Sequence, residues 1–98
     1  MAHQLAKRAQ ADLDKIWDYV FEASGSAEIA DRLIDAITQR FCLLATHPEI
    51  GRLRDDLRLG RRTYPVESYV ILYRLKGADV LILRVAHSKR DLDTLFRT

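Results

Sequence analysis

The chain has 98 residues, with 48% hydrophobic residues, 31% charged residues and a formal net charge of +2, which is typical of a folded globular protein and excludes intrinsic disorder. No apolar run approaches the roughly 20 residues that cross a bilayer, the first residues show no secretory signal, and the single cysteine, Cys42, excludes an internal disulfide. We therefore expect one domain over residues 1–98, located in the cytoplasm and outside any membrane.

Charge is distributed unevenly along the chain. Residues 1–50 contain five Lys or Arg and eight Asp or Glu, a net charge of −3. Residues 51–98 contain eleven Lys or Arg and six Asp or Glu, a net charge of +5. This asymmetry favours an acidic or polyanionic partner for the second half, although small domains also carry uneven charge without using it.

Two amphipathic helices are predicted in the first half. Apolar residues recur at helical spacing between Ala9 and Phe21, which predicts a helix that ends at Gly25. Ser26 is a suitable N-cap for a second helix, and Pro48 ends that helix because the residue before a proline avoids the α region. The chain therefore begins with a helical hairpin.

A second apolar line runs along the second helix, beside its main apolar stripe. Its members are Ile29, Ala36 and Leu43, which are spaced by seven residues and therefore share one side of the helix. One interpretation is a wide surface that faces the core. The other is a flank that receives a partner.

The connector GRLRDDLRLGRR at residues 51–62 contains five arginines. Asp55 and Asp56 offset part of its charge, and its three leucines are expected to anchor the loop to the core. We therefore do not expect direct nucleic-acid binding. The arginines, with Arg54 and Arg62 among them, are interpreted as candidate contacts for an acidic protein partner.

Two strands joined by a tight turn are predicted in the last third. The segments RRTYPVESYVILYRL and VLILRVAH are rich in β-branched and aromatic residues, and Gly77 supplies the flexible backbone of the KGAD turn. If the turn contains two residues, Tyr73 opposes Ile82 and Ile71 opposes Arg84. A short strand at residues 3–6 and one helical turn in the tail complete the predicted elements.

The predicted register gives the two faces of this hairpin different compositions. The face with Val70 and Leu72 is expected to pack under the helices. The other face carries Tyr69, Tyr73 and Arg84, and tyrosine and arginine are enriched at binding hot spots. Either this face binds a partner, or Arg84 lies over the tyrosine rings of a half-exposed sheet.

Motifs for cofactor or metal chemistry do not occur in the sequence, so we expect no cofactor and no metal. A metal-independent ribonuclease needs an acid, a base and cations that stabilise the charge on phosphorus. His87 supplies an acid or a base, and Glu67 supplies a base. The candidate cations are Arg62, Arg84, Lys89 and Arg90. On the predicted register, however, His87 and Arg84 point to opposite faces, which weakens the interpretation as an enzyme.

Four segments carry a resemblance to a known family: AQADLDKIWDYV, HPEIGRLRDDLRLGRRTYPV, YVILYR and ILRVAHSKRDL. In this order and spacing the chain resembles the ParE branch of the RelE/ParE superfamily of bacterial toxins. The resemblance covers nearly the whole chain. It implies an α+β fold in which an N-terminal helical hairpin packs on a small, twisted, mainly antiparallel sheet.

The resemblance also implies a function. ParE-like members are toxins of type II toxin–antitoxin systems that inhibit DNA gyrase by protein–protein binding. A ParD-like antitoxin, with a ribbon–helix–helix domain and an acidic tail, neutralises the toxin in a hetero-oligomer. The alternative is a RelE-like ribosome-dependent mRNA endonuclease, but no tyrosine follows Tyr73, so the C-terminal tyrosine of that branch is missing and Phe96 is the late aromatic residue.

Two sets of contact residues are expected from these considerations. The antitoxin is expected to cover the helix flank and the aromatic face of the sheet, that is, Ile29, Ala36, Leu43, Tyr69, Tyr73 and Arg84. The target is expected to contact the basic connector and tail, that is, Arg54, Arg62, Lys89 and Arg90. If the protein is a ribonuclease, its catalytic residues are His87, Arg84, Lys89 and Arg90.

Overall fold

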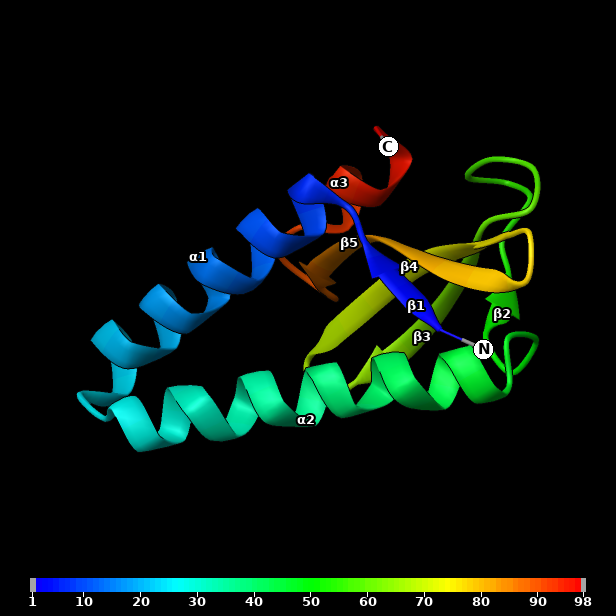
Figure 1. The fold of residues 1–98 in the computed structure, drawn as a ribbon. Helices are drawn as coiled ribbons and strands as arrows, with labels where there is room; N and C mark the ends of the chain where they lie inside the picture. The colour runs from blue at the N-terminus through cyan, green and yellow to red at the C-terminus, as the bar shows by residue number, and fades with distance from the viewer. Residues whose placement is uncertain (1, 98) are drawn as a thin grey trace.

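Two long helices lie against one face of a five-stranded sheet in the computed structural model, which describes residues 2–97 (Figure 1). The elements are β1 (His3–Leu5), α1 (Lys7–Ser24), α2 (Ala27–Thr46), β2 (Arg52–Leu53), β3 (Arg62–Val66), β4 (Tyr69–Lys76), β5 (Asp79–His87) and α3 (Leu92–Phe96). The strand order is β1-β5-β4-β3-β2, with β1 parallel to β5 and all other neighbours antiparallel. The predicted α+β fold is confirmed.

In the turn of the helical hairpin, α1 ends and α2 begins at the predicted capping residues. Gly25 adopts the left-handed conformation with φ of 69°, and its N–H donates to the carbonyl of Phe21 at 2.7 Å. The side chain of Ser26 accepts a hydrogen bond from the N–H of Ile29 at 3.2 Å. Both helix ends at the turn therefore have partners for backbone groups that water would otherwise solvate. Within the described residues, neither helix is apolar enough over its length to cross a membrane.

The β4–β5 hairpin has the predicted register only near its turn. Tyr73 pairs with Ile82 as expected, but a β-bulge at Leu83 shifts the pairing by one residue, so that Leu72 lies opposite Arg84. The predicted pairing of Ile71 with Arg84 is therefore wrong. A bulge adds one unpaired residue to a strand, and an alternating apolar pattern does not reveal it.

The face of the sheet that packs under the helices is also the opposite of the predicted one. Tyr69, Ile71 and Tyr73 belong to the main core with α1 and α2. Leu72 packs on the other face, in a smaller cluster that includes Leu95 of α3. Both faces of β4 are apolar, so alternation alone does not decide which of them lies under the helices.

The connector after β2 folds back on itself over the smaller cluster. The side-chain Oδ1 of Asp55 accepts from the N–H of Gly60 at 3.0 Å, which closes the loop. Leu57 packs against the smaller cluster as expected. Leu53 and Leu59 do not anchor the loop, because 48% and 86% of their surfaces are exposed.

Candidate functional site

Tyr69 and Tyr73 lie inside the core, where burial raises the pKa of both phenols. The exposed fraction is 6% for Tyr69 and 0% for Tyr73. The Tyr73 hydroxyl accepts from the N–H of Gly51 at 2.9 Å and donates to the carbonyl of Pro48 at 2.7 Å. Tyr73 thus ties the loop after α2 to the sheet. The prediction that the two tyrosines form an exposed binding face is wrong.

Arg84 is held by Asp12 of α1 and does not lie between the tyrosine rings. Its Nε and Nη2 donate to the two carboxylate oxygens of Asp12 at 2.8 and 3.0 Å. Asp12 also accepts from the backbone N–H of Val85 at 2.9 Å. The hydrogen bond with Asp12 raises the pKa of Arg84 above its usual value. A partner that bound this guanidinium would compete with a bidentate internal carboxylate.

His87 closes the turn that follows β5. Its Nδ1 accepts from the backbone N–H groups of Lys89 and Arg90, both at 3.2 Å, and its ring meets that of Tyr69 edge-on with 5.3 Å between centroids. Because Nδ1 accepts these hydrogen bonds, a neutral His87 ring carries its proton on Nε2. The imidazole therefore has a structural role in positioning the tail.

The predicted ribonuclease residues are only partly brought together. Arg84 and His87 line the same small cleft of about 170 Å³, with Asp12 on its wall. Strand alternation directs the two side chains to opposite faces. Strand β1 pairs only with Val80–Ile82, so the next residues of β5 have no neighbouring strand on this edge, and Arg84 meets Asp12 of α1. Its charge is then matched by Asp12.

Arg90 stacks on an exposed aromatic ring. Its guanidinium carbon lies 4.3 Å from the ring centroid of Tyr19 on α1, and 52% of Tyr19 is exposed. The two residues line a cleft of about 260 Å³ together with Lys15 and Tyr69. Lys89 beside them is exposed. A tyrosine and an arginine in contact at the surface are the residue types that dominate protein–protein hot spots.

Arg54 and Arg62 have hydrogen-bond partners within the chain. Arg54 forms a bidentate pair with Asp56 at 2.9 and 2.8 Å. Arg62 donates to the carbonyls of Glu49 and Gly51 at 3.3 and 2.9 Å. Of the four predicted target-binding residues, Arg54 and Arg62 therefore stabilise loops around β2, while Lys89 and Arg90 follow β5.

The predicted helix flank is accessible. Ile29 is 49% exposed, and Ala36 and Leu43 are half-buried. The flank lies on one side of the buried stripe of α2, and helical geometry places Ile34 and Thr38 on the other side. The members of this line are neither fully in the core nor fully in water, and a flank that receives a partner stays a prediction.

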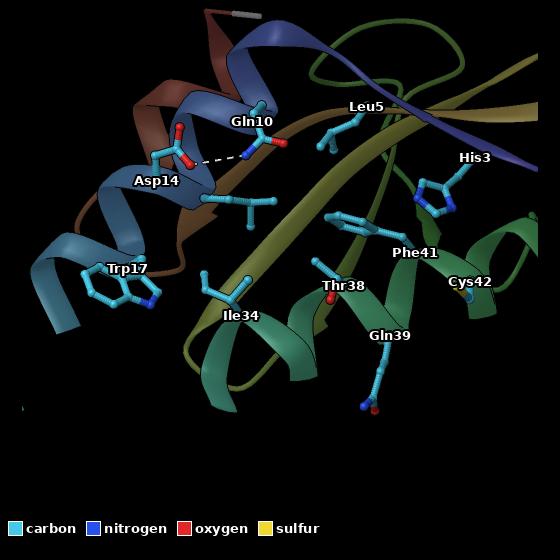
Figure 2. A pocket seen from close by; sticks show the side chains of 11 residues that line it. His3, Leu5, Gln10, Asp14, Trp17, Ile34, Thr38, Gln39, Phe41 and Cys42 are labelled. Carbon is cyan, nitrogen blue, oxygen red and sulfur yellow. Dashed lines mark hydrogen bonds between the residues drawn. The ribbon is translucent and has the colours of Figure 1, made fainter. Parts of the chain in front are cut away.

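A groove of about 510 Å³ opens on that other side of α2, between the two helices and β1. Figure 2 shows Leu5 of β1 and Ile34 and Phe41 of α2 pointing into it, with Trp17 of α1 at one end. The helical periodicity placed Trp17, Ile34 and Phe41 on the apolar stripes of the two helices but did not predict the groove. The helices diverge from their common turn (Figure 1), and amphipathic periodicity does not report an interhelical angle.

Comparison with known proteins identifies the class of this fold. The family model described as ParE toxin of type II toxin-antitoxin system, parDE, matches residues 4–92. Toxin ParE3 of Caulobacter vibrioides is 40% identical over 81 residues, which cover 83% of this chain and 80% of that protein. Toxin RelE3 of the same organism is 35% identical over 86 residues, covering 87% of this chain and 91% of that protein.

Solved structures agree with this assignment. The chromosomal ParDE system from P. aeruginosa contains a chain with a TM-score of 0.80 and 27% identity, covering 91% of this chain and 97% of that one. The toxin–antitoxin complex RelBE2 from Mycobacterium tuberculosis gives a TM-score of 0.59 and 26% identity, covering 88% and 95%. The protein belongs to the ParE toxin family of type II toxin–antitoxin systems.

Proposed function

We propose that this protein arrests growth by binding DNA gyrase in the cytoplasm and is neutralised by a ParD-like antitoxin. The observation that carries the proposal is the family match over residues 4–92. The solved chain most relevant to the pairing comes from a ParDE toxin–antitoxin system, which supports a hetero-oligomer. The antitoxin would carry a ribbon–helix–helix domain and an acidic tail that complements the basic second half of the toxin.

The groove beside α2 and the flank of Ile29, Ala36 and Leu43 are the two surfaces that suit an antitoxin. The groove is lined by apolar side chains from three elements, which is the usual receptor for one face of an amphipathic helix. Such a helix, if it comes from a disordered antitoxin tail, folds as it binds and covers a wide surface.

For the target, we propose the tail cluster of Tyr19, Lys89 and Arg90. Tyr19 and Arg90 are in contact and both are exposed, so the pair offers two residue types that are enriched at hot spots. Arg54 and Arg62 stay weaker candidates, because their guanidinium groups hold Asp56 and two loop carbonyls.

We propose a non-enzymatic mechanism, because the candidate catalytic groups are already engaged within the chain. Arg84 is neutralised by Asp12, and Nδ1 of His87 is engaged by two backbone N–H groups. The alternative is a ribosome-dependent mRNA endonuclease. The observation that favours this alternative is the shared cleft of Arg84 and His87, together with the 35% identity to Toxin RelE3.

One pair of assays separates the two functions. We expect the purified protein to inhibit DNA supercoiling by gyrase and to increase the amount of cleaved DNA, while mRNA in translating ribosomes stays intact. Growth arrest without gyrase inhibition at micromolar protein would reject the gyrase proposal. Messenger RNA cleavage that disappears in His87→Ala would establish the endonuclease instead.

A further inference from the structure

A single ring atom of His87 holds the short segment between β5 and α3. Its Nδ1 accepts from the backbone N–H groups of Lys89 and Arg90, both at 3.2 Å, and its carbonyl accepts from the N–H of Asp91 at 3.1 Å. The ring nitrogen thus takes the place that a side-chain oxygen takes in an Asx turn. An imidazole nitrogen binds a proton in mild acid, whereas the amide oxygen of an asparagine does not.

The two ends of this segment are fixed by contacts that do not involve the imidazole. The N–H of Ser88 donates to the carbonyl of Ser68 at 2.9 Å, and Leu95 of α3 is buried in the smaller cluster. The two residues held by the His87 ring lie between these anchors and are exposed. Loss of the ring contacts would therefore free the middle of the segment and leave β5 and α3 in place, which is a local opening of the fold.

Arg90 is the residue that such an opening displaces. Its guanidinium carbon lies 4.3 Å from the ring centroid of Tyr19 on α1, within the distance at which a cation and a ring attract each other. The Arg90 backbone is held by His87, so the contact between the tail and α1 depends on the imidazole. His87 is in this sense a positioning residue for Arg90.

The surroundings of the ring do not favour an added positive charge. Asp12, the carboxylate from α1, is engaged by Arg84, and the Tyr69 ring of β4 meets the imidazole edge-on. Helix α3 contributes Thr94 to the cleft, which does not titrate. The charged residues of the cleft and of the turn are Asp12, Lys15, Arg84, Lys89, Arg90 and Asp91. Cations therefore outnumber carboxylates around His87.

We infer that His87 is a proton-controlled switch: the neutral ring keeps Arg90 docked over Tyr19, and a proton on Nδ1 releases it. A protonated Nδ1 is a donor and faces the two N–H groups with an N–H of its own. Histidine side chains change charge between roughly pH 5 and pH 8, so the tail is docked at the alkaline end of this range and released at the acidic end. The switch is a property of the isolated chain and does not depend on gyrase being the target.

The test is an NMR pH titration of the isotopically labelled full chain from about pH 8 to about pH 5. While Arg90 is docked, its methylene protons should show nuclear Overhauser effects to the Tyr19 ring and a ring-current shift. We expect both signals at the alkaline end and their loss at the acidic end. The midpoint of this loss should coincide with the titration of the carbon-bound ring protons of His87.

Two substitutions of His87 separate the acceptor from its proton. His87→Asn places Oδ1 on Cγ, where the imidazole has Nδ1, and this oxygen does not titrate, so the signals between Arg90 and Tyr19 should persist at both ends of the range. His87→Ala removes the acceptor, and the signals should be weak throughout. His47→Asn, at the end of α2, is the matched control and should respond to pH as the unaltered chain does. Circular dichroism verifies that each variant is folded.

The inference is overturned if Arg90 stays docked while the His87 ring titrates, or if His87→Asn keeps the pH response, which would assign it to another group. A docked tail in His87→Ala would show that the imidazole does not hold the segment. A released tail in His87→Asn at both ends of the range would show that packing of the ring, and not its acceptor nitrogen, holds Arg90 in place.

Discussion

Asp12 of α1 and Arg84 of β5 form a bidentate ion pair that also covers the open edge of the sheet. The Arg84 Nε lies 2.8 Å from Asp12 Oδ2, and the same oxygen accepts from the Val85 N–H at 2.9 Å. Strand β1 ends its pairing with β5 at Ile82. The Asp12 carboxylate thus accepts from the Val85 N–H, as a neighbouring strand would. It also joins the first helix to the last strand.

Removal of Asp12 should therefore destabilise the protein. Asp12→Ala leaves the Arg84 guanidinium and the Val85 N–H without this acceptor, and we expect a loss of about 2 kcal/mol in the free energy of unfolding. Urea denaturation measures it. Asp12→Ala/Arg84→Met should lose less than the sum of the single variants, since the unpaired charge is gone; strict additivity would contradict the coupling.

Gly51 is required because of its contact with Tyr73. A Cβ at residue 51 would lie 2.3 Å from the Tyr73 hydroxyl and 2.6 Å from its ring. Gly51→Ala should therefore cost more than about 3 kcal/mol, as overpacking at a rigid site does. Gly60→Ala is the matched control, because φ is +79° with open space around it, and it should cost only about 1 kcal/mol.

Tyr73→Phe should not rescue Gly51→Ala, because the ring atoms would still clash with the new methyl group. Thermal unfolding of the two single variants and the double variant tests this. Recovery of stability in the double variant would show that the hydroxyl alone causes the conflict.

Stability should fall at alkaline pH through the buried phenols. Burial raises the pKa of Tyr73 and Tyr69 in the folded state, so the folded chain holds its phenolic protons more tightly than the unfolded chain. Their contribution is complete below the unfolded pKa of about 10 and is lost as pH rises above it. Tyr73→Phe should flatten the decline in unfolding free energy between pH 9 and pH 11, values chosen to bracket that pKa of about 10; an equal slope in both proteins would contradict this.

Arg90 should matter for the target and not for the fold. Its guanidinium lies over the exposed Tyr19 ring, so Arg90→Glu should weaken binding to gyrase by about 2 kcal/mol, the scale of a hot spot. Surface plasmon resonance measures the affinity. Arg32→Glu on α2 is the control. A similar loss of affinity in this variant would show that net charge, and not the Arg90 contact, causes the effect.

The two sides of α2 can be distinguished by their response to the antitoxin. Thr38→Glu places a charge at the groove and Ile29→Glu places one on the flank. If the antitoxin uses the groove, only Thr38→Glu should weaken the complex, by about 2 kcal/mol or more in calorimetry. If only Ile29→Glu weakens it, the flank is the binding surface; no loss in either variant would exclude both.

Local chemistry made the helical hairpin predictable. The ends at Gly25 and Ser26 depend on a left-handed residue and a side-chain cap that lie within a few residues of the groups they satisfy. The tight turn at Gly77 is equally local, with φ of 61°. The antiparallel pairing of Tyr73 with Ile82 followed from that turn.

The sequence by itself thus determined the helices, the hairpin turn, the class of fold and, through four short segments, the family. Only the tertiary structure decided which face of the sheet is buried, because both faces are apolar and a bulge at Leu83 changes the register between them. It also decided the role of Arg84, whose partner lies 72 residues away. Contacts at that separation depend on how whole elements pack, and no local pattern encodes them.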